Sequence, residues 1–299
     1  MRKVQVITDS CSDLSKSLME KYGIDYARMR TVRDGKETPA SLLWEYYTPK
    51  EFYDVIRGGE RITTTQVPQE EFHEIFVKYL DAGCDIVYVA CSSKQSSSVN
   101  TAQVVAKKVL ADYPDARIVC IDSMRASIGE GMLAIKAAEL AREGKTLDEI
   151  VATVEGLRNN VVQYLTVQTL DYLRRCGRVT ATSAFFGNLM GIKPILIADA
   201  DGVQTPIKKA KGRANSIREM VALMKENITD AENQTVYVIT ADCIPEEVAL
   251  IEQLVRAEIS CREIVTLPIG PIIGASVGPD SIGILAFGKE VTYRVGAAK

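Results

Sequence analysis

The chain has 299 residues, of which 46% are apolar and 25% are charged. These values are ordinary for a folded globular protein and exclude a disordered chain, a collagen-like chain and a small disulfide scaffold. The net charge is -3, from 39 acidic and 36 basic residues, so the chain lacks the positive excess that nucleic-acid binding requires. No apolar run approaches the ~18 residues of a membrane span, and no signal-peptide pattern is present, which predicts a cytoplasmic protein without stable membrane insertion.

The first half of the chain alternates short apolar runs with amphipathic helix patterns. Runs rich in Val and Ile at residues 3–9, 84–91 and 116–123 predict strands. Helix patterns begin near residues 14, 48, 68, 102, 132 and 146, and the patterns at Thr48 and Thr146 open with capping boxes. Strands that alternate with helices favour right-handed βαβ units, and therefore an α/β domain with a parallel sheet covered on both faces.

The second half has a different pattern. Strands are predicted at residues 161–167, 193–198, 203–208, 235–240, 263–267 and 281–287, with helices at 217–225 and 245–258. The turn at residues 199–202 joins two of these strands as a hairpin. This mixture predicts an α+β domain with a mixed sheet. We therefore expect an α/β protein of two domains, residues 1–160 and 161–299.

Cysteine and histidine usage limits the chemistry of the chain. The seven cysteines are odd in number and no pair has CxxC spacing, which predicts reduced, mostly buried thiols. The single histidine, His73, lies in an amphipathic helix pattern, and we interpret it as a surface residue rather than a catalytic one. We therefore predict no metal site and no cofactor.

Polar side chains follow the ends of the predicted parallel strands. Asp9 ends the first strand, Ser92 and Ser96 follow the second, and Asp122 ends the third. Because these carboxyl ends meet at one edge of the sheet, their hydroxyls and the neighbouring helix N-termini suit an anionic group such as a carboxylate or a phosphate. Taken singly, each of these residues is better explained as an ordinary helix cap, and only their gathering at one edge favours an anion site.

An enzyme is the alternative interpretation of the same edge. A phosphotransferase or a serine-dependent acyl hydrolase would use the pairs Asp9/Ser10 and Ser92/Ser96. Nucleotide motifs are weak, however. The string GEG at residues 129–131 is only the beginning of a dinucleotide fingerprint, and Asp9 is not followed by a second Asp two residues later.

Seven short strings, in order along nearly the whole chain, resemble conserved blocks of the DegV family. They are ITDSCSDL at residues 7–14, TTQVP at 64–68, SSKQS at 92–96, IDSMRASIGEG at 121–131, YLRRCGR at 172–178, NLMGIKPIL at 188–196 and GPIIG at 270–274. The resemblance implies two domains, α/β and α+β, with a ligand tunnel between them. It also implies that the protein binds one long-chain fatty acid and is not itself an enzyme.

The same resemblance implies residue roles. The fatty-acid carboxylate would meet Thr64 and Ser96, and Arg178 would lie near the site or on a surface facing a partner fatty-acid kinase. In such a partnership the kinase phosphorylates the bound carboxylate to an acyl phosphate. Burying about fifteen methylenes at ~0.8 kcal/mol each gives a gross ~12 kcal/mol, so the tail can supply most of the affinity. Candidate tunnel residues, equally consistent with an ordinary core, are Phe185, Phe186, Leu189, Met190 and Ile192.

The chain departs from the family pattern near the expected head group. Where the family has GTHTGP, residues 274–279 are GASVGP, so Ser276 replaces a histidine. Cys176 likewise replaces a glycine. Losing one hydrogen bond to a charged group costs roughly 1.5–3 kcal/mol. Two compensations are open: Ser276 donates in place of the histidine, or the carboxyl group binds partly protonated with a pKa raised by burial.

Overall fold

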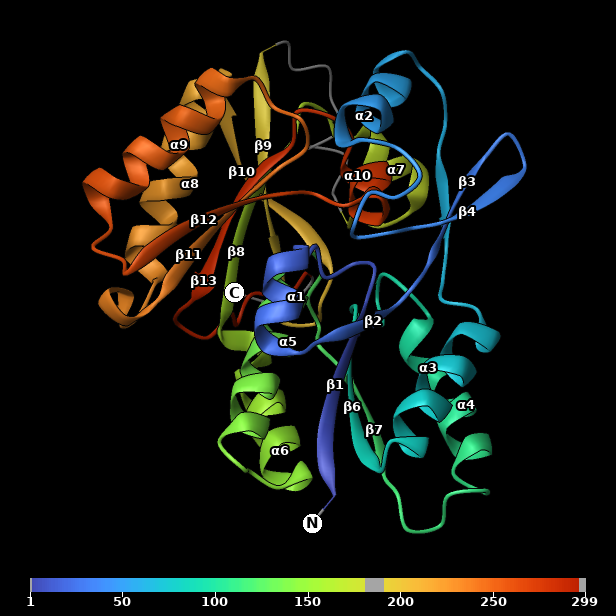
Figure 1. Ribbon diagram of the computed structural model, residues 1–299. Helices are drawn as coiled ribbons and strands as arrows, with labels where there is room; N and C mark the ends of the chain where they lie inside the picture. The colour runs from blue at the N-terminus through green and yellow to red at the C-terminus, as the bar shows by residue number, and fades with distance from the viewer. Residues whose placement is uncertain (1, 181–190, 296–299) are drawn as a thin grey trace.

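The computed structural model describes residues 2–180 and 191–295. In this part of the chain the strands form a parallel sheet, a mixed sheet and a small antiparallel sheet (Figure 1). The predicted α/β class, with a parallel sheet before residue 160 and a mixed sheet after it, is confirmed.

The parallel sheet has the strand order β2-β1-β6-β7. Its central strands are short runs of β-branched and apolar residues that are buried along most of their length, as a sheet covered by helices on both faces requires. All carboxyl ends therefore lie at one edge, next to the mixed sheet (Figure 1). The strands are β1 (Lys3–Asp9), β2 (Asp25–Ala27), β6 (Cys84–Ala90) and β7 (Ile118–Asp122).

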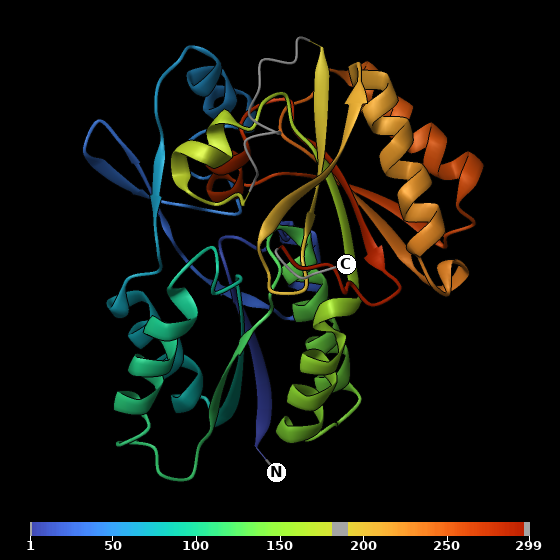
Figure 2. The same ribbon diagram turned by 180° about the vertical axis from the view of Figure 1, so that it is seen from behind.

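Helices cover both faces of this sheet. Helices α3 and α4 lie on one face, and α5 and α6 lie on the other, with α5 also in contact with the mixed sheet (Figures 1 and 2). Among the described residues, no helix is long and apolar enough to cross a membrane. The helices are α1 (Lys16–Tyr22), α3 (Gln69–Asp81), α4 (Ser98–Val109), α5 (Ile128–Arg142) and α6 (Leu147–Leu157), followed by the 3-10 turn Arg158–Asn160.

The mixed sheet has the order β10-β9-β8-β13-β11-β12, in which only β11 and β12 are parallel neighbours. Helices α8 and α9 cover its outer face, where Ile217, Met220 and Met224 are fully buried (Figure 2). The opposite, inner face of the mixed sheet is turned toward the parallel-sheet half, whose helix α5 contacts β8 and β13. The elements are β8 (Val161–Thr166), β9 (Ile192–Ala198), β10 (Gln204–Lys211), α8 (Arg213–Asn227), the 3-10 turn Ala231–Asn233, β11 (Thr235–Thr240), α9 (Pro245–Glu258), β12 (Glu263–Pro268) and β13 (Ile282–Phe287).

Six further elements pack together, four from the early part of the chain and two helices from the late part. Of these six, only α2 is predicted from the sequence. The early ones are β3 (Arg30–Arg33), β4 (Lys36–Pro39), β5 (Thr63–Thr65) and α2 (Pro49–Arg57), and the late ones are α7 (Asp171–Cys176) and α10 (Pro271–Val277). Tyr53 on α2 donates to the carbonyl of Ile269 at 2.7 Å. Arg57 pairs with Asp242 at 2.5 Å and with Asp280 at 2.7 Å.

The two large sheets are also joined by a buried arginine. The guanidinium of Arg125, in the loop after β7, donates to the carbonyls of Val161 at 3.1 Å and Asp199 at 3.2 Å. Both acceptors belong to the mixed-sheet half. No strand of the two large sheets crosses residue 160, but α2 packs against the late helix α10. The division into domains at that residue therefore stays a prediction.

Candidate functional site

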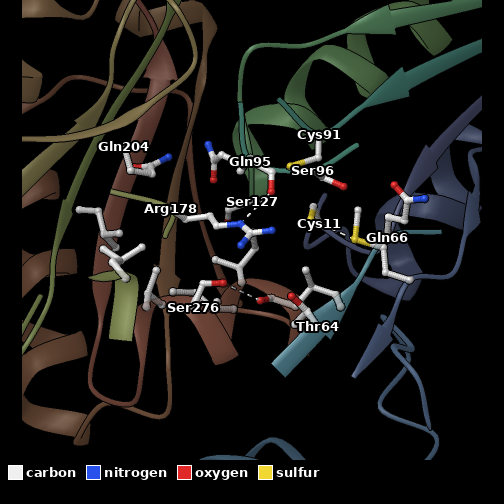
Figure 3. A pocket seen from close by; sticks show the side chains of 18 of the residues that line it. Cys11, Thr64, Gln66, Cys91, Gln95, Ser96, Ser127, Arg178, Gln204 and Ser276 are labelled. Atoms are coloured by element: carbon white, nitrogen blue, oxygen red, sulfur yellow. Dashed lines mark hydrogen bonds between the residues drawn. The ribbon is translucent and has the colours of Figure 1, made fainter. Parts of the chain in front are cut away.

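A cavity of about 200 Å³ lies where the carboxyl edge of the parallel sheet faces the mixed sheet. Figure 3 shows its side chains converging from both halves of the molecule. The four residues predicted as ligand contacts, Thr64, Ser96, Arg178 and Ser276, all line it. The structure thus brings together residues that are more than 200 positions apart in the sequence.

Thr64 is placed by the small sheet. It lies in the middle of β5, and its register partner is Thr31 on β3. The side chain is half-buried and lies near Ser276 at one end of the cavity (Figure 3). Pro68, which directly precedes α3, then turns the chain into the helix.

Ser96 is placed by the loop between β6 and α4. The hydroxyl of Ser92 and the amide of Gln95 both donate to the carbonyl of Gly202, at 2.8 and 3.2 Å, and so tie this loop to the β9–β10 turn. The hydroxyls of Ser96 and Ser98 lie 2.9 Å apart. Ser98 also accepts from the backbone N–H of Val67 at 3.2 Å. The loop that carries Ser96 is therefore fixed to the segment that follows Thr64.

Arg178 reaches the cavity because α7 ends abruptly. Gly177 caps that helix with a φ of 69°, in the left-handed region, a conformation that glycine adopts without strain. The chain then reverses, and the Nε of Arg178 donates to the carbonyl of Gln95 at 3.0 Å. A terminal nitrogen also donates to the carbonyl of Cys176. An arginine has five N–H donors, so the remaining ones are available to a ligand.

Ser276 lies in the last turn of α10. The helix begins with Pro271 at its first position, where a missing N–H costs nothing. The Ser276 hydroxyl donates weakly to the carbonyl of Ile272 at 3.4 Å. Gly274 on the same helix packs against Tyr53, because a Cβ there would lie 2.4 Å from the tyrosine oxygen. This close packing holds α10 against α2.

The cavity lining combines polar and aliphatic side chains, and its polar end is the part around Thr64, Arg178 and Ser276. Arg178 is the one charged side chain among the described lining residues, and no carboxylate lines the cavity within residues 2–180 and 191–295. An anionic head group would therefore meet positive charge and hydroxyls without a repelling acid. The apolar part of the lining consists of Met29, Ala126, Leu165, Leu173, Ile239, Ile269, Ile272, Ile273 and Val277.

The sequence analysis missed two buried amides in the wall. Gln163 on β8 and Gln204 on β10 are both 4% exposed, and the Gln163 amide donates to the Gln204 side-chain oxygen at 3.2 Å. A single polar residue inside an apolar strand is the pattern that could have revealed Gln163. Of the predicted tunnel residues, Ile192 begins β9 and does not line the cavity. Phe185, Phe186, Leu189 and Met190 lie outside the described residues.

A second hollow of about 180 Å³ adjoins the polar end. It shares Thr64, Arg178 and Ser276 with the main cavity and adds Arg61, Arg175 and Glu60, whose carboxylate pairs with Arg33 at 2.6 Å. Three guanidinium groups therefore surround the region where the two hollows meet, which makes the polar end attractive to an anion.

The edge residues proposed for an enzyme are mostly engaged in structural bonds. The Asp9 carboxylate accepts from the Tyr88 hydroxyl at 2.7 Å and from the backbone N–H of Cys91 at 3.1 Å. Ser10 donates to the carbonyl of Ala40 at 2.7 Å, and Ser92 bonds as described above. Asp9, Ser10 and Ser92 do not line the cavity. His73 is exposed on α3, as predicted.

Three acidic groups are buried behind the cavity wall, and two buried thiols line it. Burial raises the pKa of Asp9, and raises the pKa of Glu130 well above its usual range. Burial also raises the pKa of Asp13 to about 7. All seven cysteines are free thiols, as predicted, but only Cys11 and Cys91 are buried and the others are half-buried.

The fold and the site together define a class: an α/β protein with a parallel sheet, a mixed sheet and a cavity between the two. Comparison with known proteins gives the family. A family model described as "Uncharacterised protein, DegV family" matches residues 3–289, and the chain belongs to the DegV family.

Relatives and solved structures agree with this assignment. The chain is 33% identical to a DegV domain-containing protein of Clostridium perfringens over 288 residues, covering 96% of this chain and 98% of that protein. It is also similar to the structure of a DegV lipid-binding protein from Thermotoga maritima, with a TM-score of 0.83 and 27% identity. The match covers 97% of this chain and 100% of that protein. A fatty-acid-binding DegV family protein from Thermus thermophilus has a TM-score of 0.84 and 26% identity, with the same coverage of 97% and 100%.

Proposed function

We propose that this protein binds a long-chain fatty acid in the cavity between its two halves. The observation that carries the proposal is the composition of the lining: hydroxyls and one cation, a set of aliphatic side chains, two buried amides, and no acid among the described lining residues. The similar structures support it, since one is of a lipid-binding protein from Thermotoga maritima and the other is of a fatty-acid-binding protein from Thermus thermophilus.

The carboxylate would lie at the polar end, among Thr64, Ser96 and Arg178, with Ser276 in the position of the family's histidine. A buried carboxylate needs donors, because leaving it unpaired in an apolar cavity is costly. Each of these residues can donate: two hydroxyls come from the parallel-sheet half, and one hydroxyl and one guanidinium come from the mixed-sheet half.

The tail would lie along the inner face of the mixed sheet and against α10. Leu165 and Ile239 come from neighbouring parts of that face, and Ile272 comes from the helix. The tail contributes by burial of apolar area, which is non-directional, so this part of the cavity requires only a dry aliphatic lining.

The second hollow, which is lined by Arg61, Arg175 and Arg178, supports a further part of the proposal, namely a kinase partnership. A partner fatty-acid kinase would receive the bound carboxylate there and convert it to an acyl phosphate. Arg61 and Arg175 lie beside Arg178 in this hollow, where they would offset the negative charge that phosphorylation adds. In this proposal the chain itself is not an enzyme, since Asp9, Ser10 and Ser92 are occupied by internal hydrogen bonds.

Mass spectrometry of an organic extract of the purified protein tests the first step. We expect one equivalent of a fatty acid. Delipidated protein should then bind palmitic acid more tightly than hexadecanol, and Ser96→Ala should reduce that preference. Ser93→Ala is the matched control, because Ser93 lies in the same loop, is exposed and does not line the cavity. An empty extract, together with no binding of added palmitic acid, would overturn the proposal.

The kinase step is tested separately. Palmitate-loaded protein is incubated with ATP and a bacterial fatty-acid kinase, and the acyl phosphate is trapped with hydroxylamine. We expect acyl hydroxamate from loaded protein and none from delipidated protein. Tight fatty-acid binding without any hydroxamate would reject the kinase partnership and leave the binding function intact.

A further inference from the structure

Three residues at the cavity wall are not used by the proposed function. The Sγ atoms of Cys11 and Cys91 and a carboxylate oxygen of Glu130 all lie within 4.8 Å of one another. All three side chains are buried, and the two thiols line the cavity. Figure 3 shows both cysteines on the same side of it, across from Gln204.

The two thiols are held together by the backbone. Cys11 follows β1 and Cys91 follows β6, the neighbouring strand. Asp9 accepts from the backbone N–H of Cys11 at 2.9 Å and from that of Cys91 at 3.1 Å. Because the Asp9 carboxylate binds both backbone N–H groups, it fixes the positions of Cys11 and Cys91 relative to each other.

Glu130 reaches the thiols from α5. Its Oε1 accepts from the Thr8 hydroxyl at 2.7 Å, but its Oε2 is buried without a hydrogen-bond partner. Gly131 allows the helix to come this close, since a Cβ there would lie 2.8 Å from the carbonyl oxygen of Ser12. A buried carboxylate oxygen without a partner is unfavourable, and a bound cation would satisfy it.

We propose that Cys11 Sγ, Cys91 Sγ and Glu130 Oε2 form a binding site for a borderline-soft divalent cation of the Zn²⁺ type. Two sulfurs select against Mg²⁺ and Ca²⁺, which prefer oxygen ligands only, whereas zinc accepts thiolate and carboxylate together. Each thiol and the Glu130 carboxyl group release their protons to solvent as their bonds to the metal form. The fourth position falls to a group in the cavity or to the Met29 sulfur, which lies 3.5 Å from Cys11 Sγ.

Metal titration tests the site directly. Reduced, chelator-treated protein is titrated with Zn²⁺ by calorimetry and with Co²⁺ by absorption spectroscopy. We expect one equivalent of each and a thiolate-to-cobalt charge-transfer band. Cys11→Ser and Cys91→Ser should lose the band, and Glu130→Gln should weaken zinc binding at least ~10-fold. Cys120→Ser is the matched control, because Cys120 lies on the next strand, outside the cluster, and it should bind zinc like the wild type.

Anomalous diffraction from zinc-soaked crystals of the wild type keeps the test decisive if a variant does not fold. We expect a peak between the two sulfurs. A zinc peak elsewhere, unchanged binding in Cys11→Ser, or a Cys11–Cys91 disulfide in protein that binds no zinc once reduced would overturn the site. The test does not depend on fatty-acid binding, since it uses the metal alone.

Discussion

Arg178 provides the sharpest test of the proposed head-group site. Replacing it with Met keeps an unbranched side chain of similar reach and removes the charge. The guanidinium donates two hydrogen bonds, to the carbonyls of Gln95 and Cys176, and its other N–H groups can bind a ligand. A hydrogen bond to a charged group contributes ~1.5–3 kcal/mol, and an exposed ion pair only ~0.2–1 kcal/mol. Arg178 is exposed at the cavity edge, so we expect a loss of about 1–2 kcal/mol, or roughly 5- to 30-fold in Kd.

Calorimetry with delipidated protein measures this loss. Palmitic acid should bind the Arg178→Met variant more weakly, whereas hexadecanol, which has no charge, should bind both proteins alike. Raising the salt concentration should weaken palmitic-acid binding by the wild type more than by the variant, since salt screens exposed charges. Arg174→Met is the control, because Arg174 is exposed, pairs with Asp171 at 3.1 Å and lines neither hollow.

Two results would refute this reasoning. If the variant loses palmitic acid and hexadecanol equally, Arg178 acts by packing and not by charge. If it loses neither, the carboxylate lies elsewhere in the cavity, and the two buried amides Gln163 and Gln204 become the next residues to replace.

The remaining predictions concern the contacts that shape the cavity, and urea unfolding measures each of them. Arg125→Met should lower the free energy of unfolding by at least ~3 kcal/mol, because it leaves several buried carbonyls unpaired. The control is Arg117→Met, which removes the exposed ion pair between Arg117 and Asp148 and should lower the free energy of unfolding by less than ~1 kcal/mol. Tyr53→Phe should cost about 1–2 kcal/mol, since the carbonyl of Ile269 loses its donor, and an unchanged midpoint would argue against that bond. Gly202→Ala should lower the free energy of unfolding by about 1–3 kcal/mol, because its φ is +83° and overpacking adds strain. The variant should also bind palmitic acid more weakly. Normal binding would mean that the loop carrying Ser96 does not depend on this turn.

The long elements could be predicted because their apolar spacing is strong. The strand predicted at residues 3–9 matches β1 in both bounds, and the capping boxes at Thr48 and Thr146 begin α2 and α6. The small sheet could not be predicted in this way. Its strand β5 is three threonines, too short to show an alternation, and it exists because β3 lies beside it. Helix α10 likewise depends on its packing against α2.

The site was only partly predictable from the residues themselves. The position of Ser96 follows from its place after a parallel strand, but Arg178 and Ser276 entered only through the family resemblance. Gln204 lies in a hairpin strand, and nothing in its local sequence places it opposite Gln163. The Cys11–Cys91 pair is separated by 80 positions, as their numbers in the sequence show. It becomes visible only once β1 and β6 are known to be neighbours.

The contact between Tyr53 and Ile269 has a consequence for how the chain is made. The two residues are 216 positions apart, and synthesis proceeds at ~5–20 residues per second, so Ile269 follows Tyr53 from the ribosome by roughly 10–40 s. During that interval α2 lacks its partner helix α10, whereas β1, β6 and β7 all precede Ile269 in the chain and can pair. A nascent chain therefore cannot enclose a ligand until α10 has been synthesised. Closure of the cavity, and with it the proposed loading with lipid, is in this sense a property of the finished polypeptide.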